Sequence, residues 1–229
     1  MTGGLNSGKG RCHGSACLTI QPVRAVVELG ALPDVVGPTL KAVHHANRNG
    51  EVDDFIAVAF PQMHKRRGLL YSGPRVDLIG SEASLSRFAG MDSIKSLYRR
   101  EMIKAPDVED VWFNEGDAGV AYVRDRTREK TTEGRRRRIA ARAERRGRPV
   151  GTCLKQVRED TRDIMPLFYG NAVIEIRKVV ANFSGSPLLV STYGFSSPTS
   201  PAVLPVLPDS GQSAFKSSAV SDLAVNGEA

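Results

Sequence analysis

Hydrophobic positions change their spacing repeatedly along the first half of the chain, and this pattern predicts alternating strands and helices. Short apolar runs bounded by turn residues predict strands, at 24–29, 55–60, 75–79 and either 108–113 or 119–123. Helical spacing with polar caps predicts helices, at 33–47, at 81–88 behind a serine N-cap and at 92–102, while 63–71 is a basic connection. The order β-α-β-β-α-β is that of the ferredoxin-like arrangement, which hosts many functions.

The flanking segments differ from this region in composition. Strands are predicted at 172–181 and 187–193, and proline, serine and alanine dominate beyond them. We therefore expect an α+β protein with five segments: a loose leader (1–20), a ferredoxin-like domain (21–123), a basic linker with an arginine-rich helix (124–150), a smaller β-rich domain (151–207) and a disordered tail (208–229).

Positive charge is concentrated in the linker. Residues 124–148 hold twelve lysines and arginines against four acidic residues, a formal charge of +8, whereas the whole chain carries only +7. All other residues together are therefore close to neutral. A local concentration of this sign indicates a polyanionic partner, with nucleic acid as the first candidate.

The second half of the linker is predicted to be a helix. Thr132 is a suitable N-cap, and Gly147 followed by Pro149 is a stop signal. At about 100° per residue, five arginines share an arc of roughly 100°: Arg135, Arg138, Arg142, Arg145 and Arg146. A solvated charged face is the alternative, but such helices normally interleave glutamate with the cations. We therefore expect this helix to contact nucleic acid.

Composition indicates the cellular compartment and whether the protein holds a metal ion. Three cysteines make no disulfide framework, and no apolar run approaches the roughly 20 residues of a membrane span, so we expect a cytoplasmic protein without membrane contact. Cys12, His13 and Cys17 lack a second ligand pair at zinc-finger spacing, and the acidic clusters match no phosphate–metal motif. The sequence thus predicts neither a metal site nor a cofactor.

Several short motifs occur together in an order that is informative. They are AVHHAN at 42–47, IAVAFP at 56–61, a basic Arg126–Arg128–Lys130 element, the arginine helix and a terminal YGFS at 193–196. Over residues 23–207 the chain resembles the CRISPR-associated repeat-processing endoribonucleases of type I-F, which cut the repeat RNA and stay on its hairpin. The pattern RRIAARAERRG at 137–147 and the YGFSS ending are most similar to the transposon-encoded branch, whose complex guides DNA insertion.

The resemblance implies roles for individual residues. His44 matches the catalytic histidine, and Tyr193 matches a tyrosine near the active site. Arg126 and Arg128 match a linker that reads base edges, although the family usually has glutamine where Arg128 stands. Lys130 completes this RNA-binding element, and the arginine helix matches an RNA clamp. The implied partners are the 3′ stem-loop of the CRISPR RNA, the backbone protein of the Cascade complex and, in the transposon-encoded branch, a transposition targeting protein and target DNA.

Two positions depart from the family pattern. Met165 and Pro166 stand where some members have a serine that holds the reacting ribose. Ala172 and Val173 replace a base-stacking aromatic residue, for which Phe168 or Tyr169 is a substitute. A non-catalytic RNA-binding subunit therefore stays open as an alternative, as does an unrelated ferredoxin-like RNA-binding protein.

The implied reaction makes few demands on a protein. The 2′-hydroxyl of RNA attacks the neighbouring phosphate, the 5′-oxygen leaves, and a 2′,3′-cyclic phosphate remains. One histidine of near-neutral pKa can transfer the proton, and cationic side chains can stabilise the charge on phosphorus. We therefore expect a metal-independent endoribonuclease. The resemblance further implies that it retains its product and is nearly single-turnover.

Overall fold

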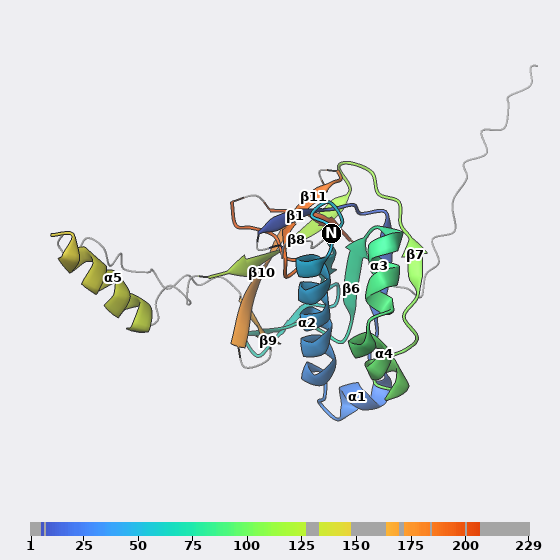
Figure 1. The fold of residues 1–229 in the computed structure, drawn as a ribbon. Helices are drawn as coiled ribbons and strands as arrows, with labels where there is room; N and C mark the ends of the chain where they lie inside the picture. The colour runs from blue at the N-terminus through green and yellow to red at the C-terminus, as the bar shows by residue number, and fades with distance from the viewer. Residues whose placement is uncertain are drawn as a thin grey trace, which may run out of the picture.

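The computed structural model describes residues 6, 8–126, 133–147, 164–169, 172–183, 185–199 and 201–206. Within them the fold is a mixed α+β fold with antiparallel sheets (Figure 1). The helices are α1 (Arg24–Glu28), α2 (Pro33–Asn49), α3 (Glu82–Ala89), α4 (Asp92–Arg99) and α5 (Glu133–Arg145). The strands are β1 (Lys9–Cys12), β2 (Ala16–Ile20), β3 (Ala57–Ala59), β4 (His64–Arg66), β5 (Leu69–Tyr71), β6 (Val76–Gly80), β7 (Val108–Asp110), β8 (Ala118–Asp125), β9 (Met165–Tyr169), β10 (Ala172–Asn182), β11 (Leu188–Ser191) and β12 (Leu204–Pro205).

The first sheet has the strand order β3-β6-β2-β7. Its strands β3 and β6 are buried along their whole length, as expected for strands covered on both faces. Helices α2, α3 and α4 lie together in front of this sheet in Figure 1. Helix α2 confirms the helix predicted over 33–47, and the side chain of Ser81 accepts a hydrogen bond from the Ser84 N–H, as an N-cap should.

The expectation of a loose leader up to residue 20 is wrong. Strand β2 lies in the middle of the first sheet, between β6 and β7, and Leu18 is completely buried there. Strand β1 pairs with β11 from the other end of the chain. The run ACLTI at 16–20 carries enough apolar surface for a central strand, and partners far away in sequence determine that it is used.

The strand predicted at 24–29 is also wrong, because these residues form the short helix α1. Its apolar residues look like a strand, but only Val26 is buried. The N–H groups of Val26 and Val27 bond the Val23 carbonyl, and Arg24 pairs with Glu28 one turn on. The strand position that this run was expected to fill belongs to β2.

The second sheet has the order β12-β8-β10-β9. The sequence offered two candidates for the fourth strand of the ferredoxin-like domain, at 108–113 and at 119–123. Both regions form strands, but β7 belongs to the first sheet and β8 to the second. The domain boundary expected at residue 123 therefore falls inside β8. Strand β9 packs against α2, so the seam between the two sheets runs along this helix.

Candidate functional site

His44 lies on the C-terminal half of α2. The buried face of this helix, which includes Val36, Leu40 and Val43, packs into the main core. His44 itself is half-buried at the edge of that face. The helix therefore holds the backbone of His44 rigidly and leaves its ring at the seam with β9.

Tyr193 reaches the same seam from a tight turn after β11. Gly194, the next residue, has φ +78°, a conformation that favours glycine. A Cβ atom there would lie 2.7 Å from Val58 Cγ2 and 2.9 Å from the Ile56 carbonyl oxygen. The Gly194 carbonyl accepts a hydrogen bond from the Val58 N–H at 3.0 Å. The glycine thus allows the turn to press against β3 and carry Tyr193 to α2.

The two residues that the family resemblance singled out are in contact. The rings of His44 and Tyr193 are stacked, with centroids 4.2 Å apart and planes at 17°. Tyr169, the last residue of β9, meets His44 edge-on at 5.9 Å. On Tyr193 the Arg124 guanidinium lies 4.8 Å from the ring centroid, a cation–π geometry. We call these four residues the His44 cluster.

Asn47 is a buried residue whose side chain forms hydrogen bonds to the segments around the His44 cluster. It is 1% exposed and lies one turn after His44 on α2. Its amide donates to the carbonyls of Ile56 at 2.9 Å and Thr192 at 3.3 Å, and its Oδ1 accepts the Ile56 N–H at 2.7 Å. Asn47 therefore connects the helix that carries His44 with β3 and with the turn that carries Tyr193.

Replacing Asn47 with alanine is expected to lower the free energy of unfolding by about 2–3 kcal/mol, because buried backbone groups lose their partners. Denaturant unfolding measures this loss as a lower midpoint at unchanged slope. Asn49→Ala is the matched control, since that exposed amide donates to the His45 carbonyl on its own helix and connects no other element among the described residues. Equal losses in both variants would contradict the connecting role.

Electrostatics in the cluster favour a neutral imidazole and an anionic ligand. Burial lowers the pKa of His44; the Thr192 carbonyl opposes this shift, and the cationic side chains of Arg48 and Arg124 add to it. Its Nδ1 atom is buried and has no hydrogen-bond partner among the described residues. Burial, with Tyr193 nearby, raises the pKa of Tyr169, so its hydroxyl stays protonated at neutral pH. A neutral base with the Arg124 guanidinium on the neighbouring Tyr193 ring, and with Arg48 one turn further along α2, suits a phosphodiester.

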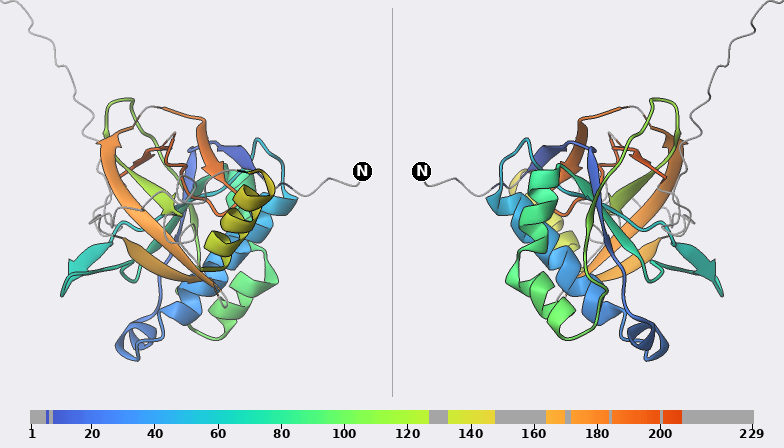
Figure 2. Two further views of the ribbon diagram at one scale, coloured as in Figure 1. Left: turned by 90° about the vertical axis from the view of Figure 1, so that its left-hand side faces the viewer. Right: turned by 90° about the vertical axis from the view of Figure 1, so that its right-hand side faces the viewer.

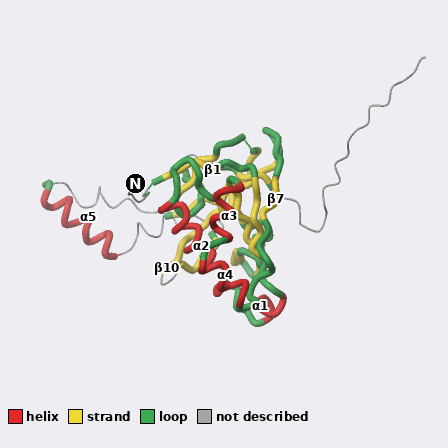
Figure 3. Tube along the Cα trace, turned by 45° about the vertical axis from the view of Figure 1, so that its right-hand side comes forward, coloured by secondary structure: helices red, strands yellow, loops and turns green. Residues whose placement is uncertain are grey.

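The arginine-rich helix is present as predicted, but it is not brought to His44. Helix α5 begins at Glu133 and ends at Arg145, and Gly147 follows it with φ +60°. Figures 1 and 3 show α5 set apart from the other elements, on the side toward which β8 runs. Four of the predicted contact residues have exposed side chains: Arg138, Arg142, Arg145 and Arg146.

The remaining predicted RNA contacts are described only in part. Arg126 is exposed just beyond the end of β8, two residues after Arg124 of the His44 cluster. Arg128, Lys130 and the side chain of Arg135 lie outside the described residues. Among the predicted linker contacts, the structure therefore describes only Arg126, which lies close in sequence to Arg124 of the His44 cluster.

Three residues of the site were not assigned by the sequence reasoning. Asn47 belongs to the AVHHAN motif, and Arg124 is the first cation of the basic stretch, so both stood beside recognised signals. Tyr169 was considered only as a stacking substitute. Its place against His44 depends on β9 packing on α2, a contact between segments more than 120 residues apart.

The other candidate ligands have structural partners. Burial raises the pKa of the Cys12 and Cys17 thiols to about 12, so neither is a ready thiolate. Within the described residues no group of three or more histidine, cysteine or acidic side chains is placed to hold a metal ion. The Asp54 carboxylate accepts from Ser81 and pairs with Arg87 at 3.0 Å, which fixes the loop before β3 to α3.

Comparisons with known proteins add no identification: no protein-family model matches the chain, and a search of curated proteins finds no match either. Among the described residues, every helix is too short or too polar to cross a membrane.

Proposed function

We propose that this protein binds the stem-loop of a CRISPR repeat RNA and cleaves it at the base of the stem, with His44 as the general base. The observation that carries the proposal is the His44 cluster: a half-buried imidazole stacked on Tyr193, with the Arg124 guanidinium 4.8 Å from the centroid of the Tyr193 ring. The resemblance of the surrounding motifs to type I-F repeat-processing endoribonucleases gives this site its substrate.

The first sheet supports the corresponding fold. Its elements follow the chain as β2, α2, β3, β6, α3–α4 and β7, with the first and third strands inside the sheet and the second and fourth at its edges. That is the order of a ferredoxin-like βαββαβ unit. We propose that residues 16–110 form such a unit, to which β8, β9, β10 and β12 add the second sheet.

In the proposed reaction the neutral imidazole accepts the proton of the 2′-hydroxyl. The 2′-oxygen forms a bond to phosphorus, the bond to the 5′-oxygen breaks, and that oxygen leaves with a proton from the imidazolium or from water. The products are a 2′,3′-cyclic phosphate and a 5′-hydroxyl. Arg124 and Arg48 stabilise the additional negative charge on the phosphate oxygens, and Tyr193 holds the imidazole in place.

The basic linker and α5 supply the grip on the stem. Strand β8 contributes Arg124 to the His44 cluster, and the chain continues directly through Arg126 into the basic linker. A stem held on the arginine face of α5 can therefore present its base to His44. Because the deep groove of A-form RNA is narrow, we expect mostly phosphate contacts from α5 and base-edge contacts from the linker.

A cleavage assay tests the proposal. Purified protein is mixed with a hairpin-forming repeat RNA in EDTA, and the product ends are identified by mass spectrometry. One cut at the foot of the stem, leaving a cyclic phosphate, is the expected result. Intact RNA that is nevertheless bound tightly would contradict the catalytic part of the proposal.

The pH dependence of cleavage follows from the environment of His44. Because burial lowers its pKa below the ordinary value of about 6.5, the base stays neutral to a lower pH than a free histidine. We expect kcat/KM to be level from about pH 7.5 upward and to fall on the acid side with a midpoint below 6.5. Rates at subsaturating RNA across buffers of constant ionic strength measure this profile. An acid limb with its midpoint above 6.5 would contradict a general base at this position.

One observation favours a second candidate, a non-catalytic RNA-binding subunit. Met165, at the position where some members of the resembled family place the ribose-holding serine, is 1% exposed and belongs to the core. It offers no hydroxyl to the substrate. In either case, the resemblance leads us to propose assembly with the backbone protein of a Cascade complex, and with a transposition targeting protein and target DNA if the transposon-encoded branch applies.

A further inference from the structure

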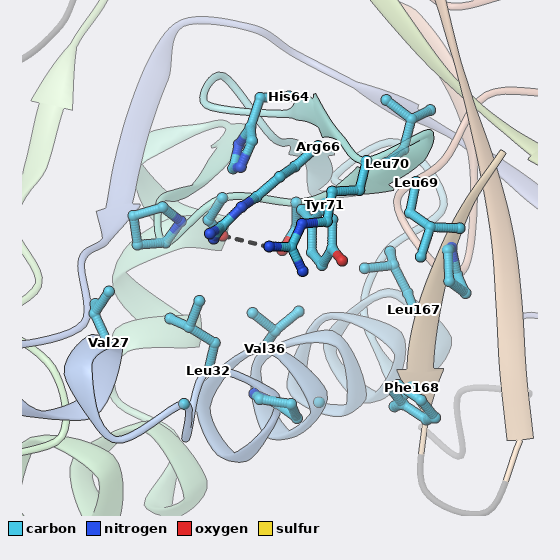
Figure 4. Close-up of a pocket in the computed structure, with 18 residues that line it drawn as sticks. Val27, Leu32, Val36, His64, Arg66, Leu69, Leu70, Tyr71, Leu167 and Phe168 are labelled. Carbon is cyan, nitrogen blue, oxygen red and sulfur yellow. Dashed lines mark hydrogen bonds between the residues drawn. The ribbon is translucent and has the colours of Figure 1, made fainter. Parts of the chain in front are cut away.

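A groove of about 730 Å³ lies beside the N-terminal half of α2. Figure 4 shows Val27, Leu32 and Val36 on one side and Leu69, Leu70 and Tyr71 of the β4–β5 hairpin on the other, with Leu167 and Phe168 of β9 closing one end. The hairpin turns through Arg67 and Gly68, which have φ values of 50° and 80°, a type I′ turn that glycine favours. Arg66, at the end of β4, and Arg67, in the turn, therefore lie on a short and largely exposed hairpin.

The lining combines apolar surface with positive charge. Tyr71 is 45% exposed and Phe168 is 58% exposed, so two aromatic rings are available for contact. His64, Arg66 and Arg67 supply the ionisable groups, and no acidic residue is among the described residues of the lining. An apolar cleft with cations and accessible aromatic rings suits single-stranded nucleic acid, whose bases stack while its phosphates contact arginine.

The groove and the His44 cluster share two elements. Gly37 lines the groove and precedes His44 by two helical turns, so the two lie about 20° apart around α2 and about 10 Å apart along it. On β9, Phe168 lines the groove and Tyr169 contacts His44. The position that a Cβ of Gly37 would occupy is 3.5 Å from the Phe168 carbonyl, so helix and strand touch between the two sites. A single-stranded RNA segment that runs from His44 along this seam reaches the groove within a few nucleotides.

We propose that this groove holds the unpaired RNA segment that adjoins the cleaved phosphodiester. The inference rests on the proposed function and extends it: α5 grips the folded stem, and the groove binds the single-stranded flank. Bases stack on Tyr71 and Phe168, and the guanidinium groups of Arg66 and Arg67 contact the phosphates. The groove therefore selects substrates with a single-stranded extension over bare hairpins.

Binding measurements test this directly. The full chain is titrated with three repeat RNAs: the bare hairpin, and hairpins with an unpaired 5′ or 3′ extension, the 3′-extended one carrying a 2′-deoxy group at the cleavage site. The 3′ extension, which adjoins the cleavage site, is expected to raise affinity about tenfold, the gain of roughly one base stacked in the groove while Arg66 and Arg67 hold its phosphates. The double variant R66Q/R67Q is expected to lose that gain and to bind the bare hairpin like the wild type.

The control variant K95Q/R99Q removes two exposed cations from α4. Figure 2 shows α4 on the opposite side of α2 from the β4–β5 hairpin. We expect it to keep the gain. A 4-thiouridine in the RNA extension should also cross-link to the β4–β5 hairpin or to β9 of the protein. Peptide mapping of the cross-linked protein would identify the position.

Two results would overturn the inference: extensions that add no affinity in the wild type, or a gain that R66Q/R67Q retains. The latter would assign the groove to another partner, such as a protein segment. If the wild type fails to bind even the bare hairpin, the proposed function itself fails, and this inference falls with it.

Discussion

Replacing His44 with alanine is expected to slow RNA cleavage by about 10²–10⁴-fold, the usual contribution of a general base, and to leave RNA affinity nearly unchanged. The ring of His44 lies at the seam between α2 and β9 rather than in the centre of the core, so its removal costs little folding energy. Single-turnover cleavage with enzyme in excess measures the rate, and a filter-binding titration measures the affinity.

His45→Ala is the matched control for this prediction. His45 is the next residue on α2, has an exposed side chain and makes no ring contact with Tyr193 or Tyr169. We expect the control to cleave at the wild-type rate. Wild-type cleavage by His44→Ala would show that another group takes the proton, and equal losses in both variants would point to damage of the helix.

Removing charge from α5 is expected to have the second large effect. Glutamine keeps the helix propensity of arginine while removing its charge. The variant changes the four exposed residues of the predicted contact face, Arg138, Arg142, Arg145 and Arg146, to glutamine. If each contacts a phosphate, the slope of log affinity against log salt concentration decreases by roughly 0.7–0.9 per residue, or about 3 in total.

The corresponding control removes four exposed cations from α1 and the α4 region, at Arg24, Lys95, Arg99 and Arg100. It has the same net charge as the α5 variant, so any difference between them reports position and not overall charge. We expect the control to keep the wild-type slope. A wild-type slope in the α5 variant would show that these arginines are a solvated face, which is the alternative that the sequence left open.

Local signals predicted much of the fold. Helix α2, the Ser81 cap of α3 and strand β10 follow from spacing and capping residues within each segment. The predictions that were wrong concern segments whose secondary structure depends on partners far away in the sequence. The run at 16–20 is a central strand only because β6 and β7 flank it, and the valines at 26 and 27 are helical because that strand position is already filled.

The candidate site was predictable only through the resemblance. Nothing local in the sequence places His44 near Tyr193, which is 149 residues away; the stacking depends on Gly194 and on the Asn47 hydrogen bonds. Hydrophobic patterning gives the faces of single elements, and it does not give the packing of β9 on α2. For the same reason Tyr169 and Arg124 could be found only in the structure.

The proposed reaction requires the reacting phosphodiester to lie at the His44 cluster. The most direct measurement is a structure of the protein bound to a repeat RNA made uncleavable by a single 2′-deoxy nucleotide at the cleavage site. A ring nitrogen of His44 is expected to lie near that 2′ carbon, close enough that a restored hydroxyl would be within about 3 Å, with the adjacent phosphate against Arg124. A cleavage-site phosphate bound elsewhere, with the His44–Tyr193 stack free of RNA, would contradict it.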